Sequence, residues 1–398
     1  MTVIVTNAQS RISYNIVKSL SLKGVKVITS DFAAPSMSFA SKYSSGHFLY
    51  PSPFDADTEP FIECMIENIR KYNASVLIPV CEETFLIAKY KDRLSKVVRV
   101  AVPDYDKILL AHNKDRWEHV ARELNIGVPE TYNINAIRRS PSLADELPFP
   151  LLVKPKQGGG GWGITQINSP CELKKHLGEE SYCDRPWERF YLQKKIDGET
   201  HCVAMLFSNG EIRGTVAYKQ LRQYPLKNGQ ATLRISRNSP EAEKNLQTLF
   251  EKIKWHGIVQ ADFVIDKNSG TPYLIDINPR FWGSLAQGIA AGVDFPYLYY
   301  KIALDGDVAP VHGFQEEVMT RWIGGDLCTF FPLLRVAANK IGFAKEFLFP
   351  GSAKVYKDDF SFGDPLPLLW WYCGAVARVL KNKLTKPASH GSLQGIWE

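Results

Sequence analysis

The stretch that decides the fold is LLVKPKQGGGGWGI, residues 151–164. Its apolar start is typical of a strand, Lys154 follows directly, and a glycine-rich loop comes next, with Gly158, Gly159, Gly160, Gly161 and Gly163. Glycines leave backbone N–H groups free to close on phosphate oxygens, and a lysine beside them supplies positive charge. It is not a Walker A loop, because the lysine precedes the glycines. The stretch predicts a phosphate-binding flap; a hairpin tip without a ligand is the alternative.

Two predicted strands further along the chain direct polar side chains to one face. A turn signal, Asn268-Ser269-Gly270, separates them and favours an antiparallel hairpin. Asp276 and Asn278 are two residues apart, so they lie on one face of the second strand, and we expect Asp262 beside them on the first. Carboxylate and amide oxygens suit magnesium, and Arg280 continues the same series. The hairpin therefore predicts a magnesium site; ordinary turn-forming residues at a strand end are the alternative.

A third segment, Gln193-Lys194-Lys195-Ile196-Asp197-Gly198-Glu199, is a predicted strand that runs into a turn, with an acid directly after the glycine. Such a segment can offer backbone groups to adenine and a carboxylate to ribose hydroxyls. Without the other two segments, a solvated hairpin is a better interpretation of this segment than a nucleotide-binding site.

In this order, the three segments resemble the ATP-grasp superfamily over residues 1–310, and they are most similar to stand-alone carboxylate–amine ligases related to carbamoyl-phosphate synthase and D-alanine–D-alanine ligase. The resemblance implies that ATP phosphates are bound by Lys114, Lys154 and the glycine loop at Gly158–Gly163. It implies an adenine hinge and a ribose ligand at Gln193, Lys194, Ile196 and Glu199. It also implies magnesium ligands at Asp262, Asp276 and Asn278, with Arg280 steadying the transferring phosphoryl group.

The sequence departs from the family pattern at two places. Asp276 stands where the bridging metal ligand is usually a glutamate, which is one methylene longer. The hinge usually carries an acid at or beside Gln193, whereas Lys194 and Lys195 follow it here.

A basic segment, residues 218–234, is punctuated by Pro225 and Gly229 and is interpreted as a substrate loop. We expect Lys219 near the γ-phosphate, and Arg222 and Arg234 near the carboxylate or acyl phosphate of the substrate. Solvated basic side chains on a hairpin are an equally good explanation.

The predicted fold class is α/β and α+β, in three parts. Residues 1–112 alternate strand signals, among them 97–103, with helix-length segments, which predicts a Rossmann-like domain with a parallel sheet and helices on both faces. The first turn, residues 6–11, contains no glycine, so no dinucleotide site is predicted. Residues 113–310 have denser strands and form the predicted two-part ATP-grasp fold, with its lid at about 115–190. Residues 311–398 form a small C-terminal region of helical and aromatic character.

The amino-acid composition indicates which partners and which cellular compartment to expect. Hydrophobic residues make up 45% and charged residues 23% of the 398, as in soluble globular proteins, and the net charge of +6 is spread out, which argues against nucleic-acid binding. Seven cysteines without a C-x-x-C pair indicate a reducing compartment. The chain starts with a strand pattern and no signal peptide, so a cytoplasmic location is expected.

The apolar segment at 365–376 is too short to span a membrane. A helix packed on the body is the favoured interpretation, and weak peripheral membrane contact through an interfacial helix is the alternative. A homodimer is left open.

Together these features predict an ATP- and Mg²⁺-dependent ligase, with Mn²⁺ as an alternative metal. It would activate a small-molecule carboxylate as an acyl phosphate and couple it to an amine, with Arg280, Lys219 and Arg234 as catalytic residues. The alternatives are an ATP-grasp kinase, a biotin-type carboxylase component and a nucleotide-binding regulator without turnover.

Overall fold

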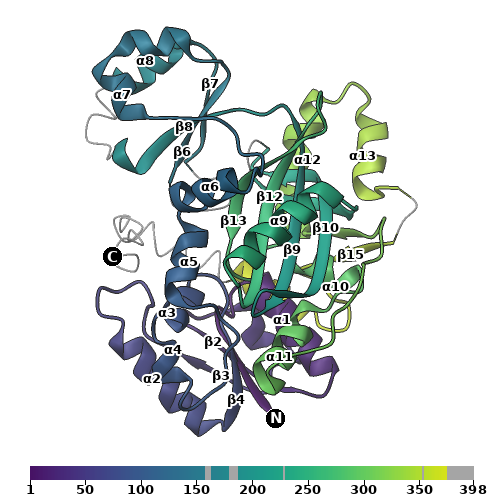
Figure 1. Cartoon of the computed structure of the whole chain (residues 1–398). Helices are drawn as coiled ribbons and strands as arrows, with labels where there is room; N and C mark the ends of the chain where they lie inside the picture. Colours follow the sequence, from purple (N-terminus) through teal and green to yellow (C-terminus); the bar gives the residue numbers. More distant parts are fainter. Residues whose placement is uncertain (157–162, 179–186, 227–228, 352–353, 374–398) are drawn as a thin grey trace, which may run out of the picture.

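A computed structural model describes residues 1–156, 163–178, 187–226, 229–351 and 354–373. Within them the chain forms three sheets with flanking helices (Figure 1). This mixed α/β architecture confirms the predicted fold class, whereas the domain limits at 112 and 310 stay predictions.

The N-terminal sheet has four parallel strands in the order β3-β2-β1-β4. Alternate residues of β1 pack on opposite faces: Val3 and Val5 contact the cluster containing α1, and Ile4 contacts the cluster containing α2. Both faces are therefore covered by helices, as a parallel sheet requires. The elements are β1 (Thr2–Val5), α1 (Arg11–Leu22), β2 (Lys26–Asp31), η1 (Met37–Ala40), β3 (His47–Leu49), α2 (Glu59–Lys71), β4 (Ala74–Ile78), α3 (Glu83–Lys89), α4 (Lys91–Leu94) and α5 (Tyr105–His112).

The strand predicted at 97–103 does not form. Only an isolated parallel bridge joins Arg99 to Val76, although Val98 and Val102 are buried. These apolar residues pack in the core instead of pairing in a sheet. The chain then turns at Pro103 into α5, so the strand pairing does not extend beyond the single bridge.

A small four-stranded sheet, in the order β5-β8-β6-β7, lies at the upper left of Figure 1 with α7 and α8. It has its own core, which includes Ile137, Val153 and Leu192. We call residues 131–194 the lid lobe. Its elements, after α6 (Lys114–Glu123), are β5 (Thr131–Tyr132), α7 (Ile134–Arg139), η2 (Pro141–Glu146), β6 (Leu151–Pro155), β7 (Thr165–Ile167), α8 (Pro170–Gly178), η4 (Trp187–Arg189) and β8 (Phe190–Lys194).

The largest sheet has seven strands in the order β13-β12-β9-β10-β11-β14-β15, and every pair is antiparallel except β14 with β15. The predicted turn at 268–270 lies between β12 and β13, and a turn at 209–210 connects β9 to β10. The elements are β9 (Gly198–Ser208), β10 (Glu211–Tyr224), β11 (Gln230–Ser236), α9 (Pro240–Lys252), β12 (Gly257–Asp266), β13 (Pro272–Asn278), α10 (Leu285–Ala290), α11 (Phe295–Asp305) and β14 (Met319–Arg321).

The described part of the C-terminal region contains helices, and it also contributes strands β14 and β15 (Val355–Lys357) to the large sheet. Its helices are α12 (Ile323–Val336), α13 (Lys340–Leu348) and a helical segment at 366–373. No helix in the described ranges is long and apolar enough to cross a membrane.

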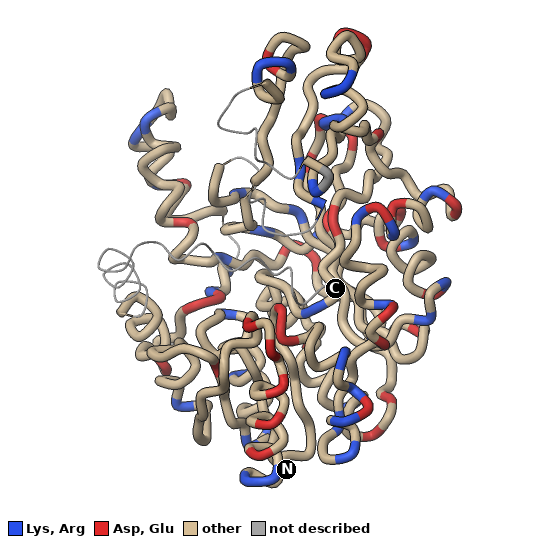
Figure 2. The backbone as a smooth tube through the Cα atoms, turned by 90° about the vertical axis from the view of Figure 1, so that its left-hand side faces the viewer, with Lys and Arg blue, Asp and Glu red and all other residues tan. Residues whose placement is uncertain are grey.

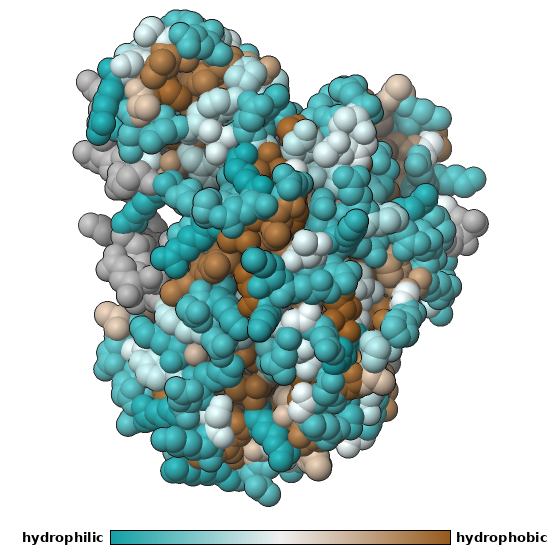
Figure 3. Space-filling model, in the orientation of Figure 1, coloured by the Kyte–Doolittle hydropathy of each residue, from teal (hydrophilic) through white to brown (hydrophobic). Residues whose placement is uncertain are grey.

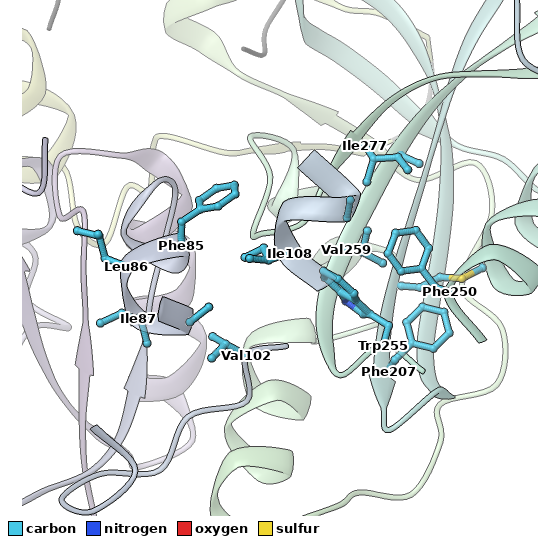
Figure 4. Packing of buried hydrophobic residues seen from close by; sticks show 14 of the residues in the cluster. Phe85, Leu86, Ile87, Val102, Ile108, Phe207, Phe250, Trp255, Val259 and Ile277 are labelled. Carbon is cyan, nitrogen blue, oxygen red and sulfur yellow. The ribbon is translucent and has the colours of Figure 1, made fainter. Parts of the chain in front are cut away.

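One buried cluster joins the N-terminal sheet to the large sheet. Figure 4 shows Phe85 and Ile87 on one side, Ile108 of α5 in the middle, and Phe250 and Trp255 on the other. Because these side chains form a single core, the loops after β4 and β13 are held in a fixed relation to one another.

Candidate active site

A cavity of about 410 Å³ lies between the lid lobe and the large sheet. Lys154 and Gln193 line it from the lid lobe, and Asp262, Asp276 and Asn278 line it from β12 and β13. In Figure 3 the molecule is hollowed between the lid lobe, at the upper left, and the body. The cavity therefore combines the groups of the first two sequence signals.

Two carboxylates face each other in this cavity. Asp262 pairs with Asp276 across the β12–β13 ladder, and its Oδ1 accepts hydrogen bonds from Cys202 Sγ (2.9 Å) and Gln260 Nε2 (2.6 Å). Burial, and then the charge of Asp276, raise the pKa of Asp262 to about 6. A nearby cation would offset the repulsion between two acids held this close.

The donor set fits magnesium. Asn278 Nδ2 donates to Gln260 Oε1 (2.8 Å), which leaves the amide oxygen of Asn278 for a metal. Two carboxylates and an amide oxygen are hard ligands, and water and phosphate oxygens would complete the shell. The described part of the chain holds no group of three or more His, Cys, Asp or Glu side chains suited to a metal, so the site would depend on this smaller set.

Two buried lysines lie beside the acids. Lys114 Nζ donates to Asp276 Oδ1 at 2.7 Å, and Lys154 Nζ donates to Gln193 Oε1 at 2.9 Å. Burial, and then the charge of Lys114, lower the pKa of Lys154 to about 8. At neutral pH Lys154 is still mostly charged, and an incoming phosphate would favour that charged form.

The structure places only part of the predicted adenine and ribose segment, residues 193–199, in the cavity. Gln193, Lys194, Lys195 and Ile196 line the cavity. Glu199 does not line it, because it alternates along β9 with the cavity-lining Gly198 and Thr200; its carboxylate accepts from Lys219 Nζ at 2.6 Å. The predicted ribose acid and the predicted γ-phosphate lysine are therefore paired with each other.

The glycine loop is only partly described. Gly158, Gly159, Gly160 and Gly161 lie outside the described residues. Gly163 has a φ of +75°, and Ile164, directly after it, lines the cavity.

Arg234 does not face the cavity, contrary to the substrate role expected for it. Its side chain is fully buried, donates to Thr320 Oγ1 and Ala231 O (both 2.8 Å), and pairs with Asp358. Arg222 is likewise paired, with Asp326 at 2.7 Å. The C-terminal region supplies both partners, so these arginines attach that region to the sheet.

Two cavity residues, Gln260 and Arg11, were not predicted. Gln260 lies two residues before Asp262, so the two-residue period of a strand would have identified it. Arg11, at the start of α1, donates its Nε to Gly283 O at 3.0 Å. No local sequence pattern predicts the contact between Arg11 and Gly283, because the two residues are 272 positions apart.

Charged residues elsewhere follow no single pattern. Figure 2 shows Lys and Arg interspersed with Asp and Glu along the backbone, without a continuous basic stripe in that view.

Known proteins are similar to part of this chain. Residues 111–284 match the family model of the ATP-grasp domain. Carbamoyl phosphate synthase large chain from Thermoanaerobacter sp. (strain X514) is 25% identical over 227 residues, which cover 52% of this chain but only 20% of that protein.

Solved structures share the fold at low identity. Biotin carboxylase from Campylobacter jejuni superimposes with a TM-score of 0.64 and 17% identity, covering 80% of this chain and 74% of that one. L-amino acid ligase from Bacillus licheniformis has a TM-score of 0.59 and 16% identity, covering 78% and 77%. Residues 111–284 are therefore similar to an ATP-grasp domain, and the chain shares the fold of these solved structures.

Proposed function

We propose that this protein is an ATP-dependent carboxylate–amine ligase that works through an acyl phosphate and releases ADP and phosphate. The observation that carries the proposal is the cavity between the lid lobe and the large sheet. There, two buried lysines lie opposite two carboxylates and an amide, and Arg280 lies at its edge.

ATP would bind with its triphosphate in this cavity. Lys114 and Lys154 would contact phosphate oxygens, and backbone groups at Lys194 and Ile196 would receive the adenine. The biotin carboxylase with a similar fold was solved as a complex with β-γ-ATP. Glu199 is proposed as the ribose ligand, which requires that its ion pair with Lys219 open and that its side chain turn toward the cavity.

Asp262, Asp276 and Asn278 would hold Mg²⁺, or Mn²⁺ in its place, and the bound ion would offset the negative charge of the phosphates. The acids must be ionised to do so, and the raised pKa of Asp262 means that this carboxyl becomes protonated at a higher pH than an ordinary aspartate.

In the first chemical step, a carboxylate oxygen of the substrate attacks the γ-phosphorus, and the bond from that phosphorus to ADP breaks. Arg280 would stabilise the charge spread over the transferring group, as fixed cations do in phosphoryl transfer. In the second step the amine attacks the acyl carbon, loses a proton, and phosphate leaves with the bonding electrons.

Neither step requires a nucleophilic side chain. Burial raises the pKa of the Cys81 and Cys202 thiols well above the usual range, so both are neutral at physiological pH and poor nucleophiles. This supports direct transfer between ATP and the acid.

The test is ADP release by the purified full chain with ATP, Mg²⁺ and pools of carboxylic acids and amines, with product masses recorded. A carboxylate labelled with oxygen-18 should deliver one label to the released phosphate. Unlabelled phosphate would exclude the acyl phosphate. A phosphorylated product that forms without an amine would indicate a kinase, and bicarbonate-dependent carboxylation of biotin would indicate a carboxylase component.

A further inference from the structure

A second cavity, of about 350 Å³, adjoins the first and shares Arg11, Gln230, Arg280 and Gly283 with it. Three parts of the chain meet there: the N-terminal sheet, the segment after β13, and the C-terminal region. Such a junction of domains is a usual place for a small-molecule site.

The N-terminal wall has the features of a ligand site. Cys81 and Glu82 follow β4 at the carboxyl end of the parallel sheet, where α/β sheets bind ligands. Cys81 has a φ of +57°, which a residue with a Cβ rarely adopts. Strained backbone of this kind is concentrated at functional sites.

The end nearest the first cavity is cationic. Arg280 lines both cavities, and its Nη2 lies 3.8 Å from Glu82 Oε1, which is longer than a hydrogen bond. Arg280 therefore keeps donors for an incoming anion. Arg11 is held in place by Gly283 O (3.0 Å) and by the ring of Trp322, 3.9 Å from its guanidinium carbon, so it forms a rigid wall.

Apolar side chains also line the cavity, together with the buried Asp359. Ile12 and Met37 are buried there, and the helical segment 366–373 adds Leu368 and Trp371, both half-buried. A ligand that fills this cavity would place an anionic group at Arg280 and apolar surface against these side chains.

We propose that the second cavity binds the carboxylic acid to be activated, and that this acid carries an apolar or aromatic group. This inference rests on the proposed function. The carboxylate lies toward Arg280, which lines both cavities and so adjoins the proposed ATP site, while the apolar group packs on Trp371 and Leu368. Trp371 is thus a specificity-determining residue supplied by the C-terminal region.

The acid is either a plain carboxylic acid or an amino acid. Glu82, beside Arg280, would accept an α-ammonium group. Glu82→Gln should therefore weaken the binding of L-phenylalanine but not of phenylacetate if the substrate is an amino acid, and spare both if it is not.

The test is calorimetric titration of the full chain with phenylacetate, L-phenylalanine and L-glutamate, with and without Mg²⁺ and a non-hydrolysable ATP analogue. At least one apolar acid should bind, and Trp371→Ala should weaken it roughly tenfold to hundredfold. Trp370→Ala is the matched control: Trp370 is 45% exposed, does not line the cavity, and should leave the affinity unchanged. Both variants should keep the affinity for ADP and the unfolding midpoint.

The inference is overturned if neither apolar acid binds, if L-glutamate binds more tightly, or if the two tryptophan variants behave alike. Apolar acids that bind through Trp371 without supporting ADP release would refute the proposed function alone. ADP release that depends only on polar acids would refute this inference alone.

Discussion

Replacing Arg234 by methionine should destabilise the protein by about 3–5 kcal/mol without changing its affinity for nucleotide. Arg234 and Asp358 are both fully buried, and Arg234 also donates to Thr320 Oγ1 and Ala231 O. Methionine fills much of the same volume but leaves the Asp358 carboxylate buried, and its remaining ion-pair partner in the described part of the chain is Arg11, with Nε at 3.7 Å. An uncompensated buried charge is the largest part of the expected cost.

The matched control is Arg237→Met on the segment after β11. Arg237 pairs with Glu317 at 2.6 Å, but both side chains are more than half exposed, so we expect a loss of at most about 1 kcal/mol. Urea unfolding followed by circular dichroism measures both variants, and calorimetry measures their ADP affinity. If Arg234→Met kept normal stability and instead lost acid-dependent turnover, the arginine would belong to the substrate site after all.

Three further changes test the site and its surroundings. Asp276→Ala should abolish ADP release and leave the circular dichroism spectrum unchanged, whereas Asp266→Ala, at the end of β12 directly before the exposed turn, should keep full activity; near-normal activity of the first would reject the metal assignment. Lys154→Met should raise the calorimetric dissociation constant for ADP at least about tenfold, because a charged hydrogen bond to phosphate is lost; an unchanged constant would remove this lysine from the phosphate site. Burial raises the pKa of Glu83 to about 8, so the folded state holds a proton that the unfolded chain releases, and stability should fall as pH rises from about 4.5 to 8, by up to about 1.4 kcal/mol per pH unit. Glu83→Gln should flatten that slope in unfolding curves at about pH 5 and pH 8, and an equal slope in both proteins would contradict the assignment.

The acid-bearing hairpin could be predicted because its geometry is local. A strand exposes alternate residues on one face, and a short turn fixes the register of its partner. Asp262 and Asp276 consequently face each other across two strands, as the spacing indicated. The same two-residue period, continued from Asp262 to Gln260, would have added Gln260 to the predicted site residues.

The basic residues of the predicted substrate loop could not be assigned in this way. Arg234 and Asp358 are 124 positions apart, and their pairing depends on where β14 and β15 join the sheet. Lys219 and Glu199 were assigned separate roles, although antiparallel β9 and β10 bring their side chains together. A local pattern shows that a side chain is charged, but only the tertiary fold determines which charge it meets.

The strand order of the large sheet also has a consequence for synthesis of the protein on the ribosome. β11 gains its second neighbour only when β14 has emerged, and β15 follows more than thirty residues later. Until then the growing polypeptide presents an unpaired strand edge, a surface that pairs readily with other chains. Nascent chains that stall between residues 240 and 320 should therefore be the aggregation-prone species, and the ones that most need a chaperone.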